Sequence, residues 1–78
     1  MIEEINRAII IKHNTFLLIT NVNNFFEINA TTTTWDEDAF QSEYFIENGI
    51  LYSLGYFRST FNPIKKVENI TPYLHLLI

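Results

Sequence analysis

The chain has 78 residues, no cysteine and a formal net charge of −4, with nine acidic residues against five lysines and arginines. A chain of this length forms one small domain, 1–78, and the lack of cysteine excludes disulfides and thiolate metal sites as sources of stability. Apolar residues make up 47% of the sequence and aromatic residues 15%, and this content excludes an intrinsically disordered chain.

The acidic residues are concentrated in the middle of the sequence. Between Lys12 and Arg58 there is no lysine or arginine, but there are six acidic residues. Five of them fall within residues 36–47, namely Asp36, Glu37, Asp38, Glu43 and Glu47. A segment of one sign on an otherwise nearly neutral molecule favours cationic partners.

The sequence of the first third of the chain is typical of β-strands, apart from its first residues. Residues 2–7 fit one helical turn, and residues 8–12 are rich in β-branched side chains, which predicts a strand. Residues 16–22 and 25–31 predict a hairpin around Asn23-Asn24, a dipeptide that tolerates positive φ. If that loop has two residues, one face of the hairpin contributes to the core with Leu17, Ile19, Phe26, Ile28 and Ala30.

The segment that follows has two competing interpretations. Residues 34–37 fit a capping box, with acidic side chains well placed at the positive end of a helix. We therefore expect one short helix near residues 35–41 that leads into a strand. If the helix continued to Asn48 instead, Gly49 would cap its C-terminus and the next hairpin would be lost.

Asn48-Gly49 lies between two apolar, aromatic-rich runs and predicts a β-hairpin, because both central positions of a two-residue turn require positive φ. In the register that this turn fixes, the numbers of paired residues sum to 97. One face then holds Glu43, Phe45, Glu47, Ile50, Tyr52 and Leu54, and the other face holds Tyr44, Ile46, Leu51 and Ser53.

The C-terminal third is less regular. Asn62-Pro63 ends a strand, and residues 65–70 predict an edge strand whose lysines discourage pairing with other chains. Thr71-Pro72 fits the start of a terminal helix, although residues 73–78 fit a final strand equally well. The whole pattern predicts a mainly β fold at the α+β borderline, a small antiparallel sheet or barrel of about five strands with one short helix near 35–41.

No catalytic or ligand-binding motif stands out. Neither His13 nor His75 has the spacing to other polar residues that a catalytic motif requires. Residues 36–38 lack the alternating ligands and the glycine of a calcium loop. We therefore predict that the protein is not an enzyme and has no metal site and no cofactor.

Composition also bears on other classes of partner. The excess of acidic residues repels phosphate, so direct nucleic-acid binding is not expected. The sequence has no basic amphipathic helix and no apolar run that could span a bilayer, so we expect no membrane association. Residues 1–4 carry acids where a secretion signal carries basic residues, and we therefore expect a cytoplasmic location.

Protein binding fits the pattern best. Acidic side chains steer and orient a basic partner, while aromatic side chains supply most of the affinity. The candidate partner-binding residues are the five clustered acids, Asp36, Glu37, Asp38, Glu43 and Glu47, together with Trp35, Phe40, Tyr44, Phe45 and Tyr52. Apolar groups on both faces of the strands also predict a homodimer.

The leading hypothesis is a non-enzymatic inhibitor that docks on a basic protein surface. By analogy alone, many small acidic proteins of phages and mobile elements occupy basic surfaces of host nucleic-acid-handling or defence machinery, and an anti-CRISPR-like role is the sharpest form of this hypothesis. One alternative is an immunity protein or antitoxin that neutralises a basic toxin. Another is a structural β-module that self-assembles through its surplus apolar surface.

Overall fold

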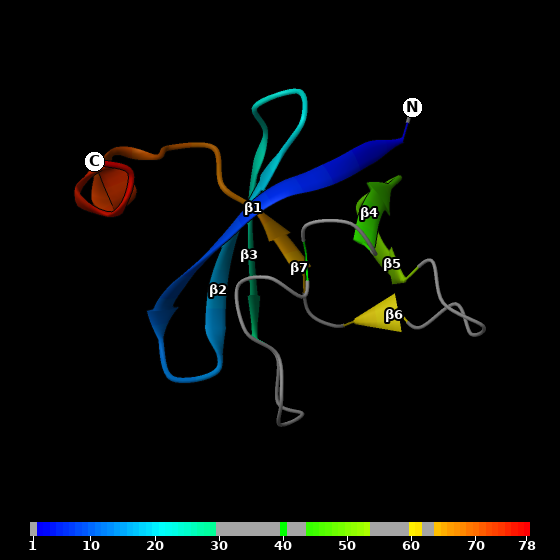
Figure 1. Cartoon of the computed structure of the whole chain (residues 1–78), viewed down its shortest axis with the longest axis horizontal. Helices are drawn as coiled ribbons and strands as arrows, with labels where there is room; N and C mark the ends of the chain where they lie inside the picture. The colour runs from blue at the N-terminus through cyan, green and yellow to red at the C-terminus, as the bar shows by residue number, and fades with distance from the viewer. Residues whose placement is uncertain (1, 30–39, 41–43, 54–59, 62–63) are drawn as a thin grey trace.

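A curled antiparallel sheet of seven strands forms most of the protein, in the order β6-β5-β4-β1-β2-β3-β7 (Figure 1). The computed structural model describes residues 2–29, 40, 44–53, 60–61 and 64–78. The predicted mainly β, antiparallel class is confirmed. The elements are β1 (Glu3–Lys12), β2 (Thr15–Thr20), β3 (Phe25–Asn29), β4 (Tyr44–Glu47), β5 (Ile50–Ser53), β6 (Thr60–Phe61), β7 (Ile64–Lys66) and the 3-10 helix η2 (Thr71–Leu76).

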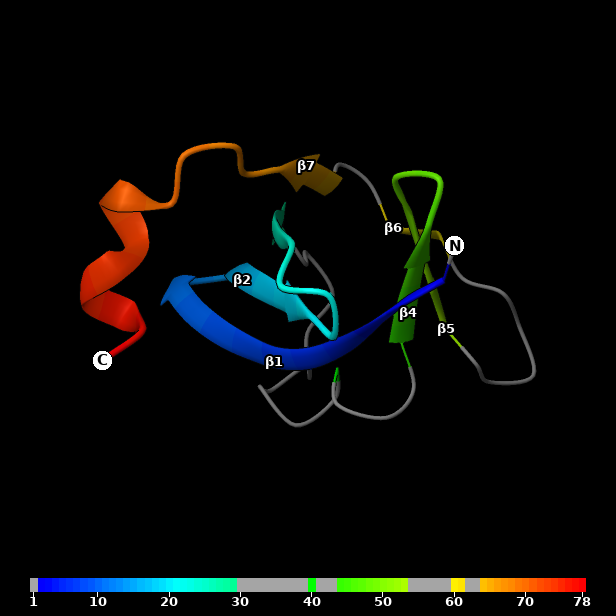
Figure 2. The same cartoon turned by 90° about the horizontal axis from the view of Figure 1, so that it is seen from above.

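The long strand β1 joins the two parts of the sheet. Its first residues pair with β4, Glu3 opposite Ile46 and Glu4 opposite Phe45, whereas the strand pairs with β2 from Ile5 onward. Figure 2 shows β1 curving from the end of the molecule that carries β4 and β5 to the end that carries η2. The two parts of the sheet therefore share one continuous backbone.

A β-bulge allows β1 to bury two residues that regular alternation would separate. Ile5 and Ala8 lie three positions apart, and in a regular strand they would point to opposite faces. Both are only 1% exposed and belong to the same core, because the register with β2 shifts between Ile5 and Arg7. The helical turn predicted for residues 2–7 is wrong, since this backbone pairs with β2 and β4 instead.

The hairpin of β4 and β5 has the predicted register. Its paired residues include Phe45 with Tyr52 and Ile46 with Leu51, so their numbers sum to 97. Asn48 and Gly49 have φ values of 53° and 76°, which are the values that a two-residue turn of this kind needs. The alternative of a helix that runs through to Asn48 is therefore excluded.

The hairpin of β2 and β3 forms, but its predicted two-residue loop is wrong. Thr20 and Asn24 close a three-residue loop, in which the Asn23 amide donates to the Thr20 carbonyl at 3.0 Å and Asn23 has a φ of 61°. This is a type I turn followed by a left-handed residue. The added loop residue changes which residues share a face. The side of the main core holds Phe16, Leu18, Phe26 and Ile28, whereas Ile19 and the fully buried Leu17 lie on the opposite face. Ala30, the remaining residue predicted for the core face, lies outside the described residues.

The core is formed on one side of the sheet by side chains from both of its parts. Phe40 is fully buried among them, with its ring centroid 5.4 Å from that of Phe16. Apart from Phe40, the helix predicted near 35–41 lies outside the described residues. The buried cluster consists of Ile5, Ala8, Phe16, Leu18, Phe26, Ile28, Phe40, Ile46 and Leu51.

A polar cluster fastens the loop between β2 and β3 to the start of β1. Glu3 Oε1 accepts hydrogen bonds from Thr20 Oγ1 at 3.1 Å and from Asn24 Nδ2 at 2.7 Å. The Asn21 amide also donates to the Glu4 carbonyl at 2.9 Å. Thr20 is fully buried, and these bonds satisfy its hydroxyl at the point where β1 changes partners.

The C-terminal elements resolve an alternative that the sequence leaves open. β7 is an edge strand, as predicted, but it covers Ile64–Lys66 rather than residues 65–70. Residues 71–76 form the helix, in 3-10 form and with Pro72 in its first turn, and not a final strand. The N-cap position is occupied by Ile70 and not by Thr71, and the backbone N–H of Thr71 donates to Asn69 Oδ1 at 3.1 Å.

Replacing Gly49 with alanine should reduce the free energy of unfolding by about 1 kcal/mol. A Cβ atom at this position would meet nothing within 4 Å, so the cost comes from the positive φ and not from a clash. Chemical denaturation measures the loss, and Gly49→Asn is the matched control because asparagine tolerates this conformation better. An alanine variant as stable as the parent protein would contradict this account of the turn.

Candidate functional site

One face of the β1–β4–β5 part of the sheet combines acidic and apolar side chains. Directly opposed residues on antiparallel strands lie on the same side, as do residues two apart along a strand. Glu4, Phe45 and Tyr52 form one cross-strand row, and Glu47 and Ile50 form the next. We call these five side chains the hairpin face.

The apolar part of the hairpin face is a pair of stacked rings beside an exposed isoleucine. The ring centroids of Phe45 and Tyr52 lie 5.3 Å apart with an interplanar angle of 20°. Phe45 is only 7% exposed, whereas Tyr52 is half-buried and Ile50 is 40% exposed. A partner would therefore contact Tyr52 and Ile50, and Phe45 would support them from within the protein.

The charged part of the hairpin face is negative. Glu4 is exposed and Glu47 is half-buried, and β4 and β5 contain no lysine or arginine. Two carboxylates, Glu4 on β1 and Glu47 on β4, therefore border the apolar side chains, and β4 and β5 supply no basic neighbour. Such a surface attracts cationic groups and repels phosphate.

The structure brings together some of the predicted partner-binding residues and separates others. Phe45, Glu47 and Tyr52 share the hairpin face. Phe40 and Tyr44 lie on the core side, with ring centroids 5.0 Å apart, and the burial of Phe40 removes it from the rings that a partner can reach. The other predicted members lie outside the described residues: Trp35, Asp36, Glu37, Asp38 and Glu43.

Sequence reasoning missed the contribution of Glu4. Its place beside Phe45 depends on the pairing of β1 with β4, which joins residues about forty positions apart and leaves no local signal in the sequence. The place of Ile50 on the hairpin face, in contrast, follows directly from the predicted register, which puts Ile50 opposite Glu47.

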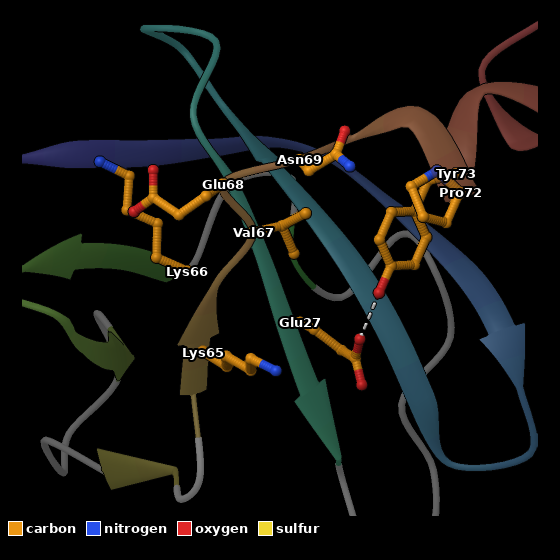
Figure 3. Close-up of a pocket in the computed structure, with 8 residues that line it drawn as sticks. All are labelled: Glu27, Lys65, Lys66, Val67, Glu68, Asn69, Pro72 and Tyr73. Carbon is orange, nitrogen blue, oxygen red and sulfur yellow. Dashed lines mark hydrogen bonds between the residues drawn. The ribbon is translucent and has the colours of Figure 1, made fainter.

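A second feature is a groove between β3, β7 and η2, with a volume of about 290 Å³ (Figure 3). Glu27 on β3 and Lys65 on β7 lie directly opposite each other. The Tyr73 hydroxyl donates a hydrogen bond to Glu27 Oε2 at 2.6 Å, and this bond links η2 to the sheet. The lining is completed by Lys66, Val67, Glu68, Asn69 and Pro72.

The same contact changes the acidity of Tyr73. The hydrogen bond to Glu27 raises the pKa of the Tyr73 hydroxyl above its ordinary value of 10.0, and partial burial and the negative charge of Glu27 act in the same direction. The physical reason is that ionising the phenol would remove the donated hydrogen bond and place two negative charges side by side.

The described residues offer no arrangement typical of an active site. Within the described ranges, no three histidine, aspartate or glutamate side chains come together as metal ligands. His13 lies in the turn after β1 and His75 in η2, and both are exposed. In the same parts of the chain, no helix has the length and apolar character needed to cross a bilayer.

No protein-family model matches the sequence, and neither a curated protein nor a solved structure is significantly similar to it.

Replacing Phe40 with alanine should reduce the free energy of unfolding by about 3–5 kcal/mol, because the ring is fully buried. For a domain of this size such a loss is close to complete unfolding. Circular dichroism during thermal denaturation measures the effect. Val22→Ala is the control, since Val22 is 41% exposed and its truncation should change stability by at most about 0.5 kcal/mol. Equal effects of the two substitutions would contradict the core position of Phe40.

The pKa of Tyr73 should fall when Glu27 is replaced by glutamine, because this substitution removes the charged acceptor. NMR titration of the tyrosine ring carbons measures the change. Since the folded-state pKa is raised, the bond stabilises the fold below pH 10.0, and its contribution is lost as the pH rises through the folded-state pKa. Tyr44 and Tyr52 serve as internal controls, and an unchanged Tyr73 titration would contradict the contact.

Proposed function

We propose that the protein is a non-enzymatic binding protein that docks its hairpin face on a basic surface of a partner protein and thereby inhibits that partner. The observation that carries this proposal is the composition of the face. Glu4 and Glu47 lie beside Tyr52 and Ile50, and no basic residue occurs on β4 or β5.

The two kinds of side chain have separate tasks in this proposal. Carboxylates near Tyr52 increase the rate of encounter with a basic surface and orient the partner. Burial of Tyr52 and Ile50 against the partner supplies most of the affinity, because a tyrosine that is already held by a stacked neighbour loses little conformational entropy on binding.

The acidic segment of the sequence adds further candidate residues to this proposal. A stable interface buries about 800 Å² on each partner, which is more than five side chains provide. Asp36, Glu37, Asp38 and Glu43 precede Tyr44, the first residue of β4, within a few positions in the sequence. We propose that Trp35 and these four acids contribute to the same docking surface.

The sharpest form of the proposal concerns the identity of the partner. Proteins that bind DNA or RNA present basic surfaces to phosphate groups, and an acidic protein surface can occupy them. We therefore propose a host nucleic-acid-handling or defence complex as the target, in an anti-CRISPR-like role. An immunity protein or antitoxin that masks a basic toxin would use the same chemistry.

Self-association is a second candidate, and a specific observation favours it. Large apolar side chains are exposed at several places on the surface: Ile2, Ile10, Val22, Ile50, Leu74 and Ile78. A homodimer or larger assembly would bury some of this surface. Light scattering distinguishes this candidate from the docking proposal, because a salt-independent oligomer that binds no other protein supports assembly.

Charge reversal on the hairpin face should weaken partner binding by about tenfold or more. The test is affinity capture from a host-cell lysate at low and moderate salt, with mass spectrometry of the retained proteins. The double variant Glu4→Lys and Glu47→Lys should lose the basic partner, and so should a variant with Asp36, Glu37 and Asp38 reversed.

The control for this experiment is Glu68→Lys, at an exposed position after β7, and it is matched in net charge to each single variant, Glu4→Lys and Glu47→Lys. This variant should retain the partner. If the double variant and the control retained the same proteins in equal amounts, the docking proposal would be wrong.

A further inference from the structure

The groove between β3, β7 and η2 contains a lysine and a glutamate that are neighbours but do not pair. Glu27 and Lys65 are cross-strand partners, which places their Cβ atoms about 5 Å apart on the same side of the sheet. In the part of the chain that the structure describes, they form no ion pair with each other. Glu27 is held by Tyr73 instead, and both charged groups border the groove (Figure 3).

The neighbouring lysine does not share this position. Lys66 is opposite Phe26, whose side chain belongs to the core, so Lys66 points to the other face of the sheet. Figure 3 shows its side chain directed away from Glu27. Lys66 and Glu68 also line the groove, so it carries charges of both signs, and Glu27 and Lys65 are the two that lie directly opposite each other on its strands.

Beside its charged residues, the groove has apolar walls and one amide. The Val67 side chain, Pro72 and the ring of Tyr73 form apolar walls. Asn69 Oδ1 accepts the Thr71 backbone N–H at 3.1 Å, and this bond leaves the Asn69 amide nitrogen as a donor at the rim. The volume of about 290 Å³ lies near the lower end of the range for small-molecule sites.

These features select one class of ligand by charge. A simple anion attracted to Lys65 would be repelled by Glu27, and a simple cation attracted to Glu27 would be repelled by Lys65. A molecule that carries both charges close together satisfies both residues at once. An apolar side chain on the same molecule would bury surface against Val67 and Pro72.

We propose that the groove binds a small zwitterion, an α-amino acid with an apolar side chain. Its carboxylate binds Lys65 Nζ, and its ammonium group binds the Glu27 oxygen that Tyr73 does not use. The ring of Tyr73 adds a cation–π contact to the ammonium group. This site goes beyond the proposed docking function and shares no residue with the hairpin face.

The experiment is an NMR titration of the labelled protein with leucine, with amide chemical shifts of β3, β7 and η2 as the readout. The matched ligands are N-acetyl-leucine, which lacks the ammonium group, and leucine amide, which lacks the carboxylate. We expect saturable shifts with leucine and about tenfold weaker binding of each derivative, because each loses one charged contact.

Two substitutions assign the contacts. Lys65→Gln should weaken leucine binding about tenfold and leaves the bond between Tyr73 and Glu27 in place. Lys12→Gln is the control, because Lys12 is exposed at the end of β1 and is not among the residues that line the groove, and it should bind leucine as the parent protein does. The proposal is overturned if leucine gives no saturable shift up to about 20 mM, if N-acetyl-leucine binds as well as leucine, or if the Lys65 and Lys12 variants behave alike.

Discussion

The continuity of the sheet depends on β1, which pairs with β4 through its first residues and with β2 through the remainder. The strand can serve both neighbours because it bends, and the register shift after Ile5 supplies the bend while it keeps Ile5 and Ala8 in one core. Glu3 reinforces the same point through its bonds to Thr20 and Asn24. The hairpin face and the groove are thus two sites on one sheet, and their relative position is fixed by a single backbone.

The parts of the fold that sequence predicts well are those decided by a few adjacent residues. Asn48-Gly49 determines the register of β4 and β5, because both residues accept the left-handed conformation and the flanking runs allow one pairing. Asn23-Asn24 also indicates a turn, yet the loop there has three residues, since Thr20 and Asn24 close it through hydrogen bonds. Asparagine at two successive positions does not reveal which of them adopts positive φ.

The sites were less accessible to sequence reasoning than the turns, because each depends on contacts between distant residues. The hairpin face acquires Glu4 through the pairing of β1 with β4, and the groove depends on a hydrogen bond between Tyr73 and Glu27 across 46 positions. Several aromatic residues of the sequence were identified as candidate partner contacts, but the sequence alone could not distinguish the buried Phe40 from the accessible Tyr52. The face of the sheet on which a ring lies is set by register, and register between strands far apart in sequence has no local code.

The attachment of the C-terminal segment implies two levels of stability in this small domain. η2 contributes no buried residue, and the bonds that connect this segment to the sheet include Val67 N to the Phe25 carbonyl and the Tyr73 hydroxyl to Glu27. A segment held in this way opens at a lower free-energy cost than the strands and does so as a separate cooperative unit. Backbone amides of residues 73–77 therefore exchange with solvent deuterium well before those of β1 and β2, whose exchange requires global unfolding.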